Sequence, residues 1–201
     1  MLWSLLIACA PLHRYPDGTG IEGQLEREVV ALQLKVQELE AGGARAGAEE
    51  ETDPLLTELV QIFSGSDVMV EATDAGPLLL VPSAAVFAEA YPPRLRDESA
   101  MVFDLLATAM GQHPTYEAVV TGHTSDRPPP SPRRGQPAID HWLLGAAQAH
   151  AFVTQLREAH GVTGARLVVS SRGDSHPIAS NDLPSGQDDN ERIEVLLRRS
   201  P

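Results

Sequence analysis

Cysteine is nearly absent from this sequence: Cys9 is the only one in 201 residues, so the chain cannot form an internal disulfide. Phe, Trp and Tyr together make up only 4% of the residues, so aliphatic side chains and alanine must fill the core. Basic residues are also scarce, with 15 Lys and Arg against 28 Asp and Glu and a formal net charge of −13. A chain this acidic has little attraction for a phosphate backbone, so nucleic acid is not expected as a partner.

Patterns that mark metal sites and hydrolases are missing too. The seven histidines form no His-x-x-x-His pair and no Cys/His cluster with the spacing of metal ligands. His123, Asp126 and a serine could be arranged as a triad, but the sequence has no Gly-x-Ser-x-Gly turn to carry a nucleophile. We therefore expect no metal, no cofactor and no enzymatic activity.

The apolar stretch at residues 2–9 is far shorter than the roughly 18–20 residues that a membrane-spanning helix needs. It fits the apolar part of an export signal, and its end, Leu-Ile-Ala-Cys, resembles a bacterial lipobox. Residues 1–9 are therefore predicted to be a signal and lipobox segment, with Cys9 as the lipid anchor of an outer-membrane lipoprotein that faces the periplasm. Because no Lys or Arg precedes the apolar run, a plain apolar N-terminus, or a true start upstream of Met1, stays open.

Residues 10–41 are predicted to be a spacer followed by an amphipathic helix. Five apolar residues recur at alternating spacings of four and three, namely Leu25, Val29, Leu32, Val36 and Leu39. This is the seam of a short coiled coil and favours a homo-oligomer. Since only about two heptads are covered, a single helix lying on the domain is the alternative. The small and acidic residues 42–52 predict a flexible linker, and residues 53–199 are expected to form a domain.

Within that domain, helical and strand patterns alternate. Helices are predicted over residues 53–63, 97–110 and 140–160, strands over 68–72, 78–81, 116–121, 166–170 and 193–197, and a polar loop over 172–189. From residue 68 the main elements follow the order ββαβαββ. Helices of ten or more residues separate strands as split βαβ units require, which predicts an α/β fold.

The most informative stretch is the strand at residues 116–121 with the polar residues that follow it. β-Branched side chains lead to Gly122, which allows either close backbone approach or an unusual dihedral angle. His123, Thr124, Ser125 and Asp126 then place donors and acceptors where the strand ends. Ligands tend to bind at this edge of open α/β sheets, so these residues form a candidate binding site.

Five blocks around this stretch occur in the order seen in a known family: Thr121–Thr124, His141–Ala149, Arg166–Leu167, Pro177–Asn181 and Asn190–Val195. Residues 67–198 thereby resemble the OmpA/MotB C-terminal domain family, and the Trp142 block with its proline-rich lead-in is most similar to the MotB branch. The resemblance implies an α+β two-layer sandwich with a mixed sheet and helices on one face. It also implies a non-catalytic protein that holds the diaminopimelate-containing peptide of peptidoglycan.

By family position, the residues expected to bind this ligand are Gly122, His123, Thr124, Ser125, Asp126, Leu144, Gln148, Asn190 and Arg192. The resemblance also implies an aspartate for the ammonium group of the ligand and an arginine for its carboxylate. This chain has Ser125 and Gln148 at those two positions, Gln187 at a further arginine position, and Asn-Glu-Arg in place of Asn-Arg-Arg at residues 190–192.

Loss of the two charged contacts predicts binding weaker by a few kcal/mol, because a hydrogen bond to a charged group contributes about 1.5–3 kcal/mol and a neutral one about 0.5–1.5 kcal/mol. Asp126 is a possible substitute for the carboxylate, and Arg127 or Arg172 for the cation. Two hypotheses follow: an envelope lipoprotein whose domain contacts peptidoglycan, or the same fold with a degenerate site that binds an envelope protein partner.

Overall fold

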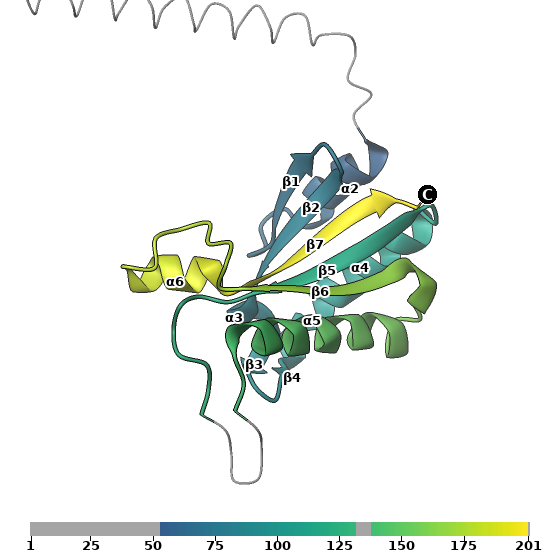
Figure 1. Cartoon of the computed structure of the whole chain (residues 1–201). Helices are drawn as coiled ribbons and strands as arrows, with labels where there is room; N and C mark the ends of the chain where they lie inside the picture. Colours follow the sequence, from purple (N-terminus) through teal and green to yellow (C-terminus); the bar gives the residue numbers. More distant parts are fainter. Residues whose placement is uncertain (1–52, 132–137, 201) are drawn as a thin grey trace, which may run out of the picture. The chain divides into compact units, whose positions relative to one another are not determined.

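A five-stranded mixed sheet organises residues 53–131 and 138–200, the part of the chain that the computed structural model describes (Figure 1). Its strands are β1 (Met69–Thr73), β2 (Gly76–Pro82), β5 (Tyr116–His123), β6 (Leu167–Gly173) and β7 (Arg192–Arg199). They lie in the order β1-β2-β7-β5-β6. All neighbouring strands are antiparallel except β5 and β6, which are parallel. The predicted ββαβαββ order of the main elements and the mixed sheet are confirmed.

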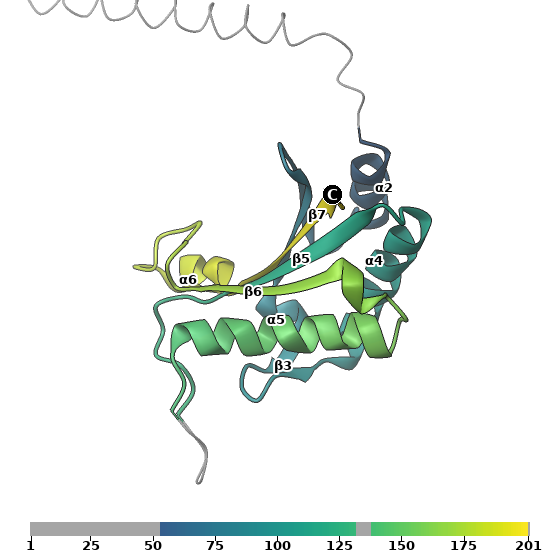
Figure 2. The same cartoon turned by 45° about the vertical axis from the view of Figure 1, so that its right-hand side comes forward.

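Three helices lie on one face of this sheet, α2 (Pro54–Ile62), α4 (Ala100–Gln112) and α5 (His141–Glu158), as Figure 2 shows. The side chain of Asp53 accepts a hydrogen bond of 2.9 Å from the backbone N–H of Leu55, and Pro54 occupies the first helical turn. Asp140 caps α5 in the same way through the backbone N–H of Leu143 at 2.7 Å. These caps satisfy amides that have no partner inside the helix, which is why both helices start where the sequence predicts.

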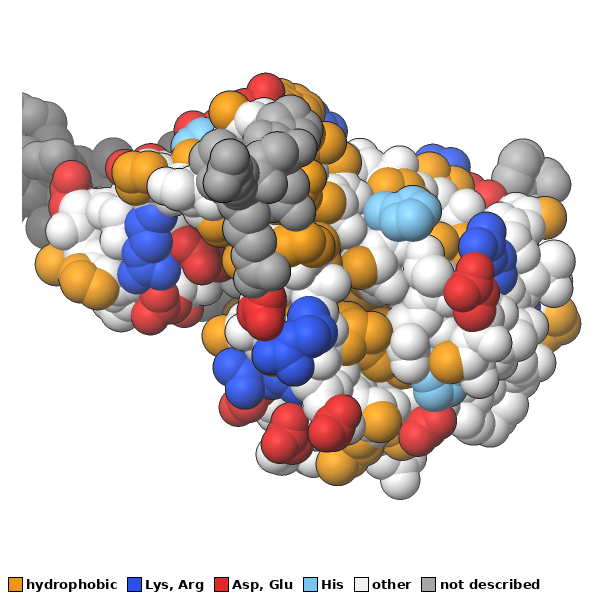
Figure 3. All heavy atoms as spheres, turned by 90° about the horizontal axis from the view of Figure 1, so that it is seen from below, with side chains coloured by type: hydrophobic (Ala, Val, Ile, Leu, Met, Phe, Trp, Pro, Cys, Tyr) orange, Lys and Arg blue, Asp and Glu red, His pale blue; other side chains and the backbone are white. Residues whose placement is uncertain are grey.

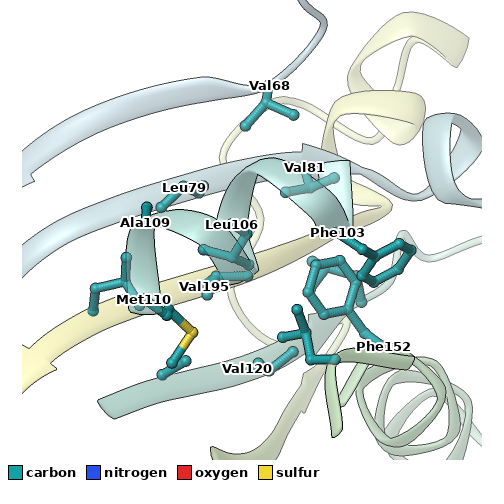
Figure 4. Close-up of a cluster of buried hydrophobic side chains, with 14 of the residues drawn as sticks. Val68, Leu79, Val81, Phe103, Leu106, Ala109, Met110, Val120, Phe152 and Val195 are labelled. Carbon is teal, nitrogen blue, oxygen red and sulfur yellow. The ribbon is translucent and has the colours of Figure 1, made fainter. Parts of the chain in front are cut away.

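The core lies between the sheet and the helices and is mostly aliphatic (Figure 4). Alternate residues of β5 and β7 point into it, including Val120 and Val195. The rings of Phe103 from α4 and Phe152 from α5 meet with centroids 4.6 Å apart and are fully buried. Phe63, Phe87 and Tyr116 are the other aromatic residues of the core, and Leu, Val, Ile, Met and Ala fill most of the remaining volume.

Several short elements were not expected from the sequence. They are α3 (Ser83–Val86), β3 (Phe87–Glu89), β4 (Arg94–Leu95), η1 (Asp97–Ser99), η2 (Gly164–Arg166) and α6 (Pro184–Asn190). The prediction of an uninterrupted polar loop over residues 172–189 is wrong, because α6 begins within it. Proline at the first position of α6 and the burial of Asn190 at its end stabilise a turn of helix that has almost no apolar periodicity.

The predicted signal segment (1–9), amphipathic helix (10–41) and linker (42–52) lie outside the described residues, as does Cys9. The described residues belong to one compact unit that extends from Thr52 to the C-terminus. Among them, no helix combines the length and the apolar character that crossing a bilayer requires. On the side seen in Figure 3, acidic, basic and apolar side chains are intermixed, without a broad area of positive charge.

Candidate ligand site at the end of strand β5

The polar residues after β5 are buried where the ends of β5, β6 and α5 meet. Thr124 is only 6% exposed; its backbone N–H donates to the carbonyl of Gly173 at 2.9 Å. Its hydroxyl oxygen lies 3.1 Å from Nδ1 of His141, the first residue of α5. Ser125, the next residue, is 1% exposed. The sequence predicted donors and acceptors at this edge of the sheet, and they lie there, but they are used in contacts within the protein.

Two glycines set the distance between β5 and α5. A Cβ atom added to Gly122 would overlap the backbone carbonyl of Gly145 and lie 2.8 Å from its Cα. A Cβ added to Gly145 would lie 2.6 Å from Oγ of Ser171. Gly122 is thus required for close backbone approach, one of the two alternatives that the sequence left open. This contact fixes the start of α5, and with it Leu144 and Gln148, against the end of β5.

The position at which the family resemblance implies an arginine is occupied by a buried, neutral side chain. Gln148 is 4% exposed, and its Oε1 accepts a hydrogen bond of 3.4 Å from the hydroxyl of Ser83 in α3. Leu144, one turn earlier, is 7% exposed. The backbone N–H of Ser83 donates to the carbonyl of Glu191 at 2.9 Å. Ser83 therefore connects Gln148 to the segment between α6 and β7, and the sequence analysis missed it because it lies 65 residues from its partner.

Ser125, where the family resemblance implies an aspartate, binds a carboxylate from elsewhere in the chain. Its hydroxyl donates a 2.6 Å hydrogen bond to Oε1 of Glu191 and accepts one of 3.2 Å from the backbone N–H of Arg127. Nη1 of Arg127 lies 3.2 Å from the same Glu191 oxygen. Asp126 is exposed and accepts from the side-chain amide of Gln187 at 2.9 Å. A negative charge is therefore present beside Ser125, although it is carried by residue 191.

Asn190 is fully buried and holds the loop that precedes α6. Its Oδ1 accepts from the backbone N–H groups of Ile178 and Ala179, at 2.7 and 3.0 Å. Its Nδ2 donates to the carbonyl of Ala179 and to Oδ1 of Asn181, at 2.9 and 2.8 Å. All four of its hydrogen-bonding positions are thus occupied within the chain. This arrangement positions the loop and α6 next to the site.

Arg192, His123 and Glu194 form a buried charged group on neighbouring strands. Nε of Arg192 donates to Oε1 of Glu194 at 2.9 Å, and Nε2 of His123 lies 3.2 Å from Oε2 of the same carboxylate. Burial raises the pKa of Glu194, but the interactions with His123 and Arg192 outweigh it and lower the pKa from 4.5 to about 2. Arg192 is thereby committed to a contact within the sheet.

No metal centre is formed by the described residues. Within residues 53–131 and 138–200, no three His, Cys, Asp or Glu side chains come close enough together to hold a metal ion. The candidate site instead consists of buried neutral hydrogen-bonding groups, Ser125, Gln148 and Ser83, next to the partly exposed ion pairs of Arg127. Such a set of groups can bind a polar or zwitterionic ligand.

Comparison with known proteins shows which family this domain resembles. The model of the OmpA family matches residues 92–191. Motility protein B of Helicobacter pylori is 27% identical over 134 residues, which cover 66% of this chain and 50% of that protein. The chain thus spans about half the length of the curated relatives that it matches.

Several solved structures are similar to this chain. The crystal structure of the periplasmic domain of Helicobacter pylori MotB matches with a TM-score of 0.59 and 25% identity, covering 68% of this chain and 85% of that one. The structure of the cell wall anchor of the T6SS from Pseudomonas aeruginosa matches with a TM-score of 0.62 and 25% identity, covering 73% of this chain and 97% of that one. A putative MotB like protein from Desulfovibrio vulgaris, at 21% identity and a TM-score of 0.65, shares the fold.

Proposed function

This chain carries a MotB-type domain of the OmpA family, and we propose that it is a non-catalytic module of the bacterial cell envelope that binds peptidoglycan. The observation that carries the proposal is the similarity to the cell wall anchor of the T6SS, because nearly the whole of that chain is matched. The ligand would be the zwitterionic, diaminopimelate-containing peptide. The periplasmic domain of MotB among the similar structures supports a location in the periplasm.

Binding is proposed to be weaker than a charged site would give. Ser125 and Gln148, at the two positions that would grip the ligand, are neutral and less than 5% exposed. Gly122, His123, Thr124, Leu144, Asn190 and Arg192 would shape the site mainly by positioning its segments, since the contacts found for them lie within the chain. Asp126 and Arg127 are the more accessible polar groups.

A second candidate function is supported by the burial of these same two side chains. Ser125 donates to Glu191 and Gln148 accepts from Ser83, so each already has a partner within the chain. A domain whose ligand site is closed in this way could serve an envelope protein partner instead of peptidoglycan.

Co-sedimentation of the full chain with purified sacculi separates the two functions. We expect a saturable fraction of the protein to pellet with sacculi, and that fraction to fall as salt rises because the remaining charges are partly exposed. Recovery equal to that of an unrelated acidic protein would contradict peptidoglycan binding and leave the protein-partner function.

The membrane anchor at Cys9 and self-association through residues 21–41 are further parts of the proposal, and both rest on the sequence. Metabolic labelling with a fatty acid should mark the wild-type chain but not a Cys9→Ser variant. Sedimentation should give an oligomer for the whole chain and a monomer for the chain without residues 21–41 if that segment forms a coiled coil. A monomer in both cases would favour the single amphipathic helix.

A further inference from the structure

Arg127 is held unusually firmly for a residue in a loop. Nε donates to Oε1 of Gln187 at 2.9 Å, Nη1 to Oδ1 of Asp188 at 2.6 Å, and Nη2 to the carbonyl of Pro184 at 3.0 Å. Nη1 also lies 3.2 Å from Oε1 of Glu191. All three guanidinium nitrogens are therefore engaged by α6 and the residue that follows it, from a position more than 50 residues earlier in the chain.

This guanidinium occupies a position with an excess of negative charge. Asp188 and Glu191 supply two carboxylates to this guanidinium, and a third, Asp126, accepts from the side-chain amide of Gln187. The carboxylate of Glu191 is also oriented from the protein interior by the buried hydroxyl of Ser125. A carboxylate that is positioned by a buried donor and paired with a cation is arranged as a receptor for a positively charged group.

A separate observation concerns a buried histidine at this end of β5. His123, two residues before Ser125, is 3% exposed. Its Nε2 is paired with the carboxylate of Glu194 at 3.2 Å, whereas its Nδ1 has no hydrogen-bond partner among the described residues. A buried ring nitrogen without a hydrogen bond is rare, so Nδ1 can accept or donate one further hydrogen bond.

We propose that Arg127 fills, from within the chain, the cation position of the ligand site, and that Glu191 with Asp188 forms this position in place of a carboxylate at residue 125. The inference rests on the proposed function, because the ligand cation would be the ammonium group of the peptidoglycan peptide. Guanidinium and ammonium groups both bind carboxylates by charge-assisted hydrogen bonds, so one can replace the other. The side chain of Arg127 is 37% exposed, so it can swing into solvent when a ligand enters.

Removal of this internal cation should therefore strengthen ligand binding. The full chain with Arg127→Gln is expected to bind a purified diaminopimelate-containing muropeptide about tenfold more tightly than the wild type, measured by calorimetry, because the ligand no longer displaces a bound cation. Adding Glu191→Gln to Arg127→Gln should abolish the gain. Arg127→Lys keeps a cation but cannot span all the acceptors at once, so it should give a smaller gain.

Arg94→Gln is the matched control, because Arg94 is 66% exposed in β4 and pairs with Glu89 in β3 rather than with α6. The proposal is overturned if Arg127→Gln binds no better than the wild type, or if Arg94→Gln gives the same gain. Thermal unfolding checks that the variants fold. If Arg127→Gln does not fold, the affinity of Arg127→Lys relative to the wild type tests the proposal instead. Sacculus binding by the wild type tests the proposed function separately: if it is present while Arg127→Gln gives no gain, only the cation-filling role fails.

Discussion

Alanine in place of Gly122 is expected to destabilise the domain by about 3 kcal/mol or more, a large effect for one methyl group. The added Cβ would overlap the carbonyl of Gly145, and it would lie 2.8 Å from the Cα of that residue. Because both atoms belong to the backbone of α5, no side-chain rotation relieves the clash. The helix would have to move away from the sheet, which would open the core around Phe152. Urea unfolding followed by circular dichroism measures the effect.

Gly111→Ala in α4 is the matched control. No atom lies within 4 Å of the position of its Cβ, and the residue is exposed in a helix. Alanine there should leave stability unchanged or raise it by up to about 1 kcal/mol, because it loses less backbone entropy on folding. Equal destabilisation by the two substitutions would mean that the Gly122–Gly145 contact does not position α5.

Acid is expected to weaken the fold through Glu194. The pKa of this carboxyl is lowered from 4.5 to about 2 by His123 and Arg192, against the effect of burial. A group with a lowered pKa in the folded state contributes stability that is present above its unfolded pKa and is lost as the pH falls through its folded pKa. Between pH 5 and pH 2 the wild type should thus lose about 3 kcal/mol that a Glu194→Gln variant does not lose.

Urea unfolding at several pH values between 7 and 2 measures this difference. Glu158→Gln is the control, because Glu158 pairs with Arg157 on the surface and its side chain is 63% exposed. Such pairs contribute under about 1 kcal/mol, so the control should follow the wild-type pH curve. If Glu194→Gln also follows the wild-type curve, the buried group of Arg192, His123 and Glu194 is not a source of stability.

The main helices and strands could be predicted because the local sequence patterns favour the same elements that the tertiary contacts stabilise. The β-branched run before Gly122 became β5, the capping residues Asp53 and Asp140 begin their helices, and the strand at residues 193–197 became the centre of the sheet. The short helix α6 could not be predicted, since it is stabilised by the buried side chain of Asn190 and by contacts with Arg127 that lie far away in sequence.

The contacts of the candidate-site residues could not be predicted from the sequence either. The family pattern located Ser125 and Gln148, but their partners come from α3 and from the end of α6, 65 and 66 residues away. No local pattern links such residues.

The hydrogen bond between Ser125 and Glu191 affects any redesign of the site, because an aspartate placed at residue 125 to restore the family pattern would face the carboxylate of Glu191. Restoring the charge there requires a simultaneous change of Glu191 to a neutral residue.

Titration of the full-length wild type with a purified diaminopimelate-containing muropeptide, followed by NMR of the backbone amides, tests the central claim most directly. The account predicts weak but saturable binding, with the largest shift changes at residues 122–127, near Gln148 and in α6. It would be contradicted by a spectrum that stays unchanged at saturating peptide, or by changes confined to the opposite end of the sheet around Tyr116 and Arg199.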